Sequence, residues 1–208
     1  MRGRPSRLHG WLLGALVLLT GLPGRSAAQS PEPGPAFGRG MQHVGFSAGV
    51  GIAIPRIGSD RDVDDVRYVA TTPRWGIGLV DPLGGEAWYR GNFELVVEGT
   101  FLTQFQPHSG TAAGGSAILR YNLLGFGRFV PFLDGGAGIL HLDFDLRDQA
   151  DGINFITQAG IGSHFFISER VALTGEWRYQ HISNARIKTP NRSINALTFF
   201  FGASIFLR

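Results

Sequence analysis

The stretch "VALTGEWRYQ", Val171–Gln180, alternates apolar and polar side chains at nearly every second position. One face carries Val171, Leu173, Trp177 and Tyr179, and the other carries Thr174, Glu176, Arg178 and Gln180. Successive side chains of a β-strand point to opposite faces, whereas a helix repeats every 3.6 residues. The pattern therefore predicts a strand with one apolar face and one polar, partly charged face.

The same period of two recurs along the chain, and no segment shows a convincing helical period. In the fifth segment we expect Leu140, Leu142 and Phe144 on the apolar face, opposite His141 and Asp143. The expected strands cover residues 46–54, 68–80, 93–105, 116–123, 129–144, 153–165, 171–183 and 197–207. An all-β fold of eight strands follows.

Eight alternating strands fit either a soluble sandwich or barrel with an apolar interior, or a membrane barrel with an apolar exterior. Segments of about 10 to 14 residues are long enough for tilted membrane strands. An open sheet edge would be costly in lipid, so the strands should close on themselves. We therefore expect an eight-stranded antiparallel transmembrane β-barrel of the outer-membrane type over residues 43–208. Its interior should hold the mid-strand charges, with Glu176 paired to Arg178 or Arg120.

The first 28 residues resemble an export signal, because a basic start with three arginines precedes the apolar run "WLLGALVLLTGL" and small residues before a cleavage point. The run is shorter than the roughly 20 residues of a spanning helix. Residues 29–42, rich in Pro and Gly, are expected to form a flexible lead. Export and a barrel together predict a location in the outer membrane of a Gram-negative cell.

Removing residues 1–28 also removes four of the 19 basic residues and none of the 16 acidic ones, which leaves a net charge of −1. The basic character of the full chain is therefore no indication of nucleic-acid binding. The chain has no cysteine, so a disulfide scaffold is excluded.

The parity of the seventh strand continues to His181 and Ser183, which should face outward, with Cα atoms roughly 7 Å apart. Asn195 shares the outward parity of the last strand and should lie beside them across the hairpin. These three side chains have the residue types of a nucleophile, a base and a group that orients the base. They are also compatible with ordinary polar residues at the membrane interface, next to an aromatic girdle of Trp177 and Tyr179.

The segment "YQHISNARIKTPNRSIN", residues 179–195, resembles the signature of the PagL family of outer-membrane lipid A 3-O-deacylases (acyloxyacyl hydrolase-like proteins). The core of that signature is His-x-Ser-Asn-Ala-Gly, followed by a Pro-Asn turn. It matches this chain at His181, Ser183, Asn184, Ala185, Pro190 and Asn191. The resemblance implies an esterase that removes the 3-O acyl chain of lipid A in lipopolysaccharide.

In this resemblance Ser183 is the nucleophile and His181 is the base. The oxyanion hole is formed by Asn184 and the backbone amides of Ala185 and Arg186. Two departures weaken the expected activity: Asn195 stands at the acidic position, and Arg186 replaces the usual glycine.

Three cations of the loop after the seventh strand, Arg186, Lys188 and Arg192, are candidates for binding the phosphates of lipid A, or are simply solvated loop residues. We expect neither a metal nor a cofactor, because the remaining histidines are scattered without ligand spacing. The Asp-rich loop at residues 60–65 is interpreted as a solvated outer loop, and the alternative is that it binds divalent cations that bridge lipopolysaccharide. The alternative to the enzyme is a non-enzymatic small barrel of the OmpX or OmpW kind, or an inactive PagL relative.

Overall fold

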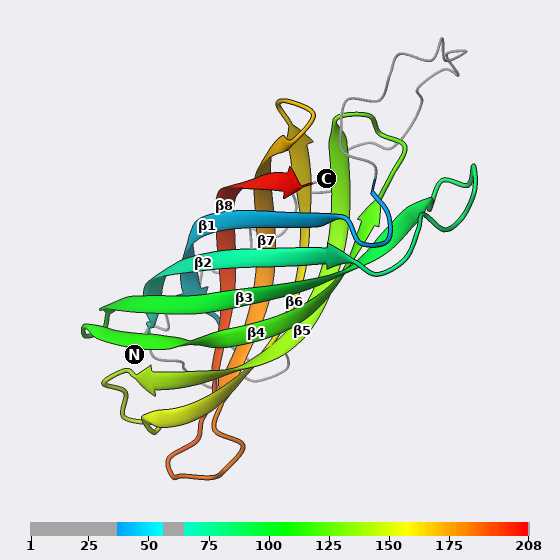
Figure 1. The fold of residues 1–208 in the computed structure, drawn as a ribbon. Helices are drawn as coiled ribbons and strands as arrows, with labels where there is room; N and C mark the ends of the chain where they lie inside the picture. Colours follow the sequence, from blue (N-terminus) through cyan, green and yellow to red (C-terminus); the bar gives the residue numbers. More distant parts are fainter. Residues whose placement is uncertain (1–36, 56–64, 208) are drawn as a thin grey trace, which may run out of the picture. The chain divides into compact units, whose positions relative to one another are not determined.

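The computed structural model describes residues 37–55 and 65–207. The predicted signal sequence, most of the predicted lead and most of the Asp-rich loop lie outside these residues. All eight expected strands are present and close into one barrel in sequence order, each antiparallel to its neighbours, with β1 paired to β8 (Figure 1). They are β1 (Gln42–Ala53), β2 (Arg67–Gly78), β3 (Gly91–Gln106), β4 (Gly110–Leu123), β5 (Phe129–Asp143), β6 (Gly152–Phe166), β7 (Val171–Ser183) and β8 (Ile194–Leu207).

No helix with the length and apolarity needed to cross a membrane occurs in the described part of the chain. The outward positions of the strands carry large apolar side chains that are about half exposed. They include Phe46, Val50, Val97, Leu119, Leu133, Ile161, Trp177, Phe201 and Ile205. Such a surface would be unfavourable in water but suits a hydrocarbon environment. With strands of 12 to 16 residues, the barrel is tall enough to span a bilayer.

Buried ion pairs lie near the middle of the interior. Arg178 contacts Glu98 at 2.6 Å and also Glu176, which confirms the expected Glu176–Arg178 pair. Arg120 contacts Asp134 at 2.8 Å and Glu176 at 3.6 Å. Arg74 Nη1 lies 2.9 Å from Glu176 Oε2, so Glu176 is shared by three guanidinium groups. Charges excluded from water are tolerated only when they are paired in this way.

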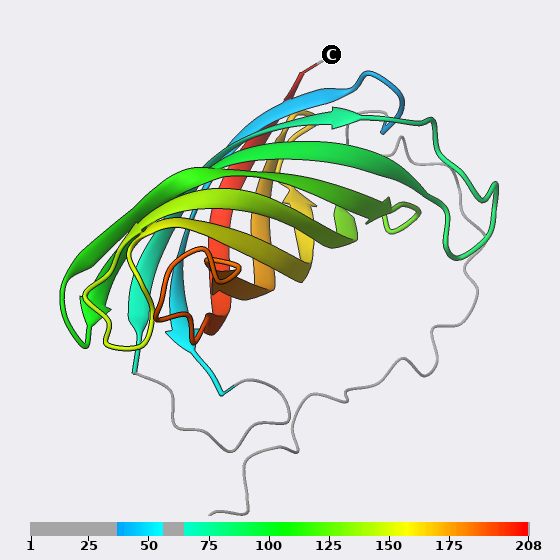
Figure 2. The same ribbon diagram turned by 90° about the horizontal axis from the view of Figure 1, so that it is seen from below.

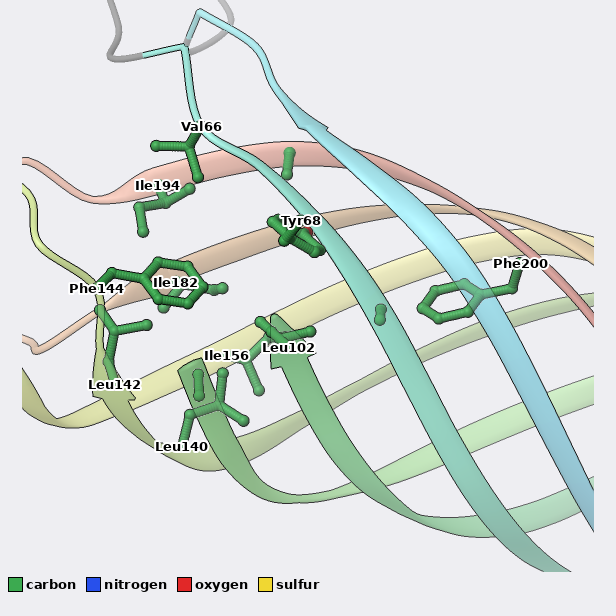
Figure 3. Close-up of a cluster of buried hydrophobic side chains, with 13 residues drawn as sticks. Val66, Tyr68, Leu102, Leu140, Leu142, Phe144, Ile156, Ile182, Ile194 and Phe200 are labelled. Carbon is green, nitrogen blue, oxygen red and sulfur yellow. The ribbon is translucent and has the colours of Figure 1, made fainter. Parts of the chain in front are cut away.

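Apolar clusters fill the interior on both sides of the ion pairs. The first lies at the end that carries the β7–β8 loop; Phe144 of the β5–β6 loop packs there near Ile182 of β7 and Ile194 of β8 (Figure 3). Gly51 leaves room for Tyr68, because a Cβ at position 51 would come within 2.2 Å of the tyrosine ring. The second cluster, at the other end, contains Phe37, Met41, Val130, Phe166, Ala172 and Phe206.

Two expectations need correction. Leu140, Leu142 and Phe144 face the interior, while His141 and Asp143 face outward. The reason is that the barrel is closed by apolar side chains at this end, so inward positions there are apolar and the polar residues lie at the outer rim. In addition, the flexible lead does not extend to residue 42, because Phe37 and Met41 are buried in the second cluster.

The β3–β4, β5–β6 and β7–β8 loops all lie at one end of the barrel, which we call the site end. The β4–β5 and β6–β7 turns at the opposite end are short, whereas the β2–β3 connection, residues 79–90, is longer. The β7–β8 hairpin protrudes clearly at the site end, drawn in orange and red in Figure 1.

Candidate active site on the β7–β8 hairpin

Tyr179, His181 and Ser183 occupy alternate positions on the outward face of β7, as strand parity predicted. The antiparallel register with β8 places His181 directly opposite Asn195. Across the other neighbour, β6, Ser183 lies opposite Phe155. The pairing of β7 with β8 thus brings the three sequence-predicted polar residues to one spot on the barrel wall.

Asn195 is in direct contact with the histidine. Its Oδ1 atom lies 2.8 Å from His181 Nδ1 and accepts a second hydrogen bond, of 2.7 Å, from the hydroxyl of Tyr179. Asn195 is only 3% exposed although it faces outward, so this polar group is shielded from water. A carbonyl oxygen accepts hydrogen bonds and does not donate them, so the contact requires a proton on His181 Nδ1. That tautomer leaves Nε2 free to act as a base.

Ser183 is half-buried at the end of β7. In the described part of the chain its hydroxyl makes no hydrogen bond, either to His181 or to another group. Catalytic hydrogen bonds are often absent without substrate and form in the complex. Ser183 shares the outward face of β7 with His181. Because its hydroxyl makes no hydrogen bond among the described residues, it is available to a substrate carbonyl.

The side chain of Asn184 organises the loop that follows β7. Its Nδ2 donates to the carbonyl of Lys188 at 2.8 Å, and its Oδ1 accepts from the amide of Arg186 at 3.0 Å. The backbone amide of Asn184 in turn donates to Asn191 Oδ1 at 3.1 Å. Asn184 is 1% exposed, so its polar atoms are used inside the loop.

The chain turns through a left-handed conformation directly after Asn184, with φ of 51° at Ala185 and 66° at Arg186. Glycine adopts such angles without strain, whereas a side chain at Cβ makes them costly. Arg186, at the position where the family resemblance implies a glycine, therefore adopts the turn in a strained conformation. Among the three candidate oxyanion donors, the Asn184 and Arg186 amides already bind side chains, and only the Ala185 amide has no acceptor within the described residues.

The three candidate phosphate-binding cations have different surroundings. Lys188 pairs with Asp151, and Arg192 pairs with Asp148; both carboxylates belong to the β5–β6 loop. The hydrogen bond and charge of Lys188 hold the pKa of Asp151 below its ordinary value. Arg186 is exposed, and no ion pair engages it in the residues that the structure describes. Arg186 is thus the cation best placed to meet an incoming anion.

Three residues of this region carry contacts that were not expected from the sequence. Tyr179 was interpreted as part of an aromatic girdle, but its hydroxyl binds Asn195. Asp148 and Gln149 contact the β7–β8 loop from the neighbouring hairpin. The contact of Tyr179 could have been found from the sequence, because strand parity places Tyr179 on the same face as His181. The contacts of Asp148 and Gln149 could not, because contacts between loops leave no periodic pattern in the sequence.

A groove of about 730 Å³ lies at the site end of the barrel, between the β3–β4, β5–β6 and β7–β8 loops, and its lining does not include His181, Ser183 or Asn195. Its polar lining includes Asp143, Asp145 and Asp151, and Lys188 and Thr189 of the β7–β8 loop form part of its wall. Among the described residues, no three His, Cys, Asp or Glu side chains are grouped closely enough to hold a metal ion.

A closed barrel with an apolar exterior, carrying a His, a Ser and an oriented amide on its lipid-facing wall, has the features of an integral outer-membrane protein with a hydrolase-type site. The family model for lipid A 3-O-deacylase (PagL) matches residues 63–204. The chain therefore belongs to the lipid A 3-O-deacylase (PagL) family of the outer membrane.

Among solved structures, the chain is similar to the crystal structure of the outer membrane enzyme PagL, with a TM-score of 0.50 and 18% identity over 77% of this chain and 98% of that chain. This likeness supports the fold. Two further similar structures are Neisserial surface protein A (TM-score 0.48, 14% identity, 80% of this chain and 96% of that chain) and the outer membrane protein OprG from Pseudomonas aeruginosa (TM-score 0.44, 12% identity, 83% and 98%). No curated protein matches the chain.

Proposed function

We propose that this chain hydrolyses the 3-O acyl ester of lipid A, with Ser183 as nucleophile, His181 as general base and Asn195 as the group that orients the base. The observation that carries the proposal is the 2.8 Å contact between His181 Nδ1 and Asn195 Oδ1, on the same outward face as Ser183. Membership of the lipid A 3-O-deacylase family supplies the substrate class.

The reaction begins with the Ser183 hydroxyl attacking the ester carbonyl, while His181 Nε2 accepts its proton. The tetrahedral intermediate then collapses, the sugar oxygen leaves, and the proton on Nε2 passes to that oxygen. Water, activated by the same nitrogen, attacks the acyl-serine and releases the fatty acid. Each proton taken by His181 is returned, so the site needs only ester and water.

The oxyanion in this proposal is held by the Ala185 amide, since the neighbouring amides of Asn184 and Arg186 already have side-chain acceptors. Loss of one donor from an oxyanion hole typically lowers kcat by about 10²- to 10³-fold. An amide in place of an acid at Asn195 lowers the rate further, because it cannot offset the charge of the imidazolium. We therefore expect a slow esterase.

The substrate reaches this site from the membrane. Phe155, opposite Ser183 on β6, presents apolar surface along which an acyl chain can lie. The exposed Arg186 lies at the start of the loop, where the phosphorylated sugar would enter. Lys188 and Arg192 hold the loop through their carboxylate partners and contribute less to phosphate binding.

The test is mass spectrometry of lipid A from cells that express the wild type or Ser183→Ala. We expect the wild type to remove one hydroxyacyl chain and the variant to leave lipid A intact. Ser163→Ala, the same change on the outward face of β6, is the matched control and should retain activity. Intact lipid A in every strain, with the barrel present in the membrane, would favour the non-enzymatic small barrel instead.

A further inference from the structure

The β5–β6 loop lies directly against the β7–β8 loop at the site end of the barrel (Figure 2). The Ala150 amide donates to the carbonyl of Pro190 at 2.9 Å, and the Arg192 amide donates to the carbonyl of Asp148 at 2.8 Å. Residues Gln149 and Asn191 form an antiparallel bridge between these two bonds. Residues 148–151, which we call the β5–β6 strap, therefore hold the second half of the β7–β8 loop through backbone hydrogen bonds.

Gln149 is the central residue of the strap and is only 3% exposed. Its Nε2 donates to Asn154 Oδ1 at 2.7 Å, and its Oε1 accepts from the backbone amide of Ser193 at 2.9 Å. Asn154 is fully buried at the start of β6, where its own Nδ2 donates to the carbonyls of Ala150 and Gly152. A continuous chain of hydrogen bonds thus runs from the barrel wall through Gln149 to Ser193.

Ser193 stands two residues before Asn195 and has a φ of 66°. This left-handed conformation is unfavourable for a residue with a side chain, so it persists only where contacts hold it. The bond from the Ser193 amide to Gln149 is such a contact. Ser193 directly precedes Ile194, the first residue of β8, so its conformation sets the direction in which the chain enters the strand that carries Asn195 opposite His181.

We propose that Gln149 is a positioning residue of the active site. By holding Ser193 in its left-handed conformation, it keeps Asn195 Oδ1 against His181 Nδ1 and so maintains the tautomer in which Nε2 is basic. The effect matters more in this chain than it would with an acid at position 195, because a neutral amide attracts the imidazole only at close range. The expected effect on the rate of ester hydrolysis rests on the proposed function, whereas the effect of Gln149 on the position of Asn195 and on the His181 tautomer does not.

The first test measures kcat and KM for release of fatty acid from lipid A. Gln149→Leu removes both hydrogen bonds and should lower kcat about ten-fold while KM changes less than two-fold. Gln149→Glu keeps the acceptor for the Ser193 amide but loses the donor to Asn154 Oδ1, so it should lower kcat less than Gln149→Leu does. Gln42→Leu, the same change at the far end of the barrel, is the control and should leave both constants unchanged.

The second test addresses the strained conformation directly. Glycine reaches a positive φ without strain, so in a Ser193→Gly background the loss caused by Gln149→Leu should shrink from about ten-fold to about two-fold. An undiminished ten-fold loss in that background would overturn the mechanism. This comparison remains informative even where Gln149→Leu alone reduces the yield of folded barrel.

A third measurement does not depend on activity. In ¹⁵N spectra of histidine-labelled protein in micelles, the His181 ring should show protonated Nδ1 in the wild type and a mixture of tautomers in Gln149→Leu. An unchanged His181 signal in Gln149→Leu would overturn the proposal. A tautomer change in a protein whose wild type cleaves no lipid A would support positioning by Gln149 and contradict the esterase function.

Discussion

Replacing Asn195 with aspartate should raise the rate of ester hydrolysis. The two side chains have the same shape, so one carboxylate oxygen takes the place of Oδ1, 2.8 Å from His181 Nδ1. The hydroxyl of Tyr179 remains as a second donor to the new carboxylate. The change therefore adds a negative charge next to the imidazole and leaves the geometry of the site as it is.

The magnitude follows from the charge that develops on His181 in the transition state. Two unit charges about 4 Å apart attract by about 4 kcal/mol at an effective dielectric constant of about 20. Because His181 is half-buried, solvent screening reduces this attraction to about 3 kcal/mol, and the amide already supplies a neutral hydrogen bond of about 1 kcal/mol. About 2 kcal/mol of additional stabilisation remains, which corresponds to a rise in kcat of roughly thirty-fold.

The assay is the initial rate of fatty-acid release from lipid A in detergent micelles, with Thr189→Asp as the control. Thr189 is exposed in the same loop, so its replacement adds the same charge without contact to His181. Asn195→Glu should also raise the rate, by a smaller factor, because its longer side chain has to repack. An unchanged or lower rate for Asn195→Asp in a properly folded barrel would refute the role of Asn195 as the orienting residue.

Three further substitutions test separate parts of the structure. Tyr179→Phe removes one hydrogen bond to Asn195 and should lower kcat about five-fold, the equivalent of about 1 kcal/mol, in the same assay. Arg186→Gly relieves a left-handed strain of about 1–2 kcal/mol, partly offset by the greater freedom of glycine in the unfolded chain, so hydrogen exchange of the loop amides should slow about three-fold. Glu176→Gln removes the negative charge that three buried guanidinium groups share, and should lower the free energy of unfolding of the barrel by about 3–5 kcal/mol in denaturant unfolding. Glu86→Gln on the surface is the control and should have little effect.

The strands could be predicted from the sequence because a lipid-facing wall imposes a strict period of two. Strand parity and the pairing of consecutive antiparallel strands place His181 and Asn195 together, and the structure brings them into contact. The prediction was wrong at Leu140 and Leu142, where apolar residues occur on the inward face. Alternation shows which face of a strand is apolar but not whether that face points into the barrel, and at the site end the interior is closed by an apolar cluster.

The contacts between loops were beyond sequence reasoning for a different reason. Gln149 and Ser193 are 44 positions apart, and their hydrogen bond depends on how the β5–β6 and β7–β8 loops pack against each other. The positive φ of Arg186 could have been anticipated from the glycine of the family signature, but that of Ser193 could not. The period of two predicts which side chains of a strand share a face, whereas the conformation of a loop is decided by a few specific hydrogen bonds.

The amide of Asn195, at the position where the family resemblance implies an acid, has a consequence beyond the missing charge. A carboxylate offers an oxygen on either side, but an amide offers its oxygen in only one of two orientations. In the reverse orientation Nδ2 would face His181, and the ring proton would have to lie on Nε2, which could then no longer accept the proton of Ser183. The hydroxyl of Tyr179 and Nδ1 of His181 both donate to Asn195 Oδ1, so Tyr179 favours the productive orientation of the amide. Tyr179→Phe should therefore cost about five-fold with Asn195 but less than two-fold in the Asn195→Asp background, and equal losses in the two backgrounds would show that Tyr179 acts in some other way.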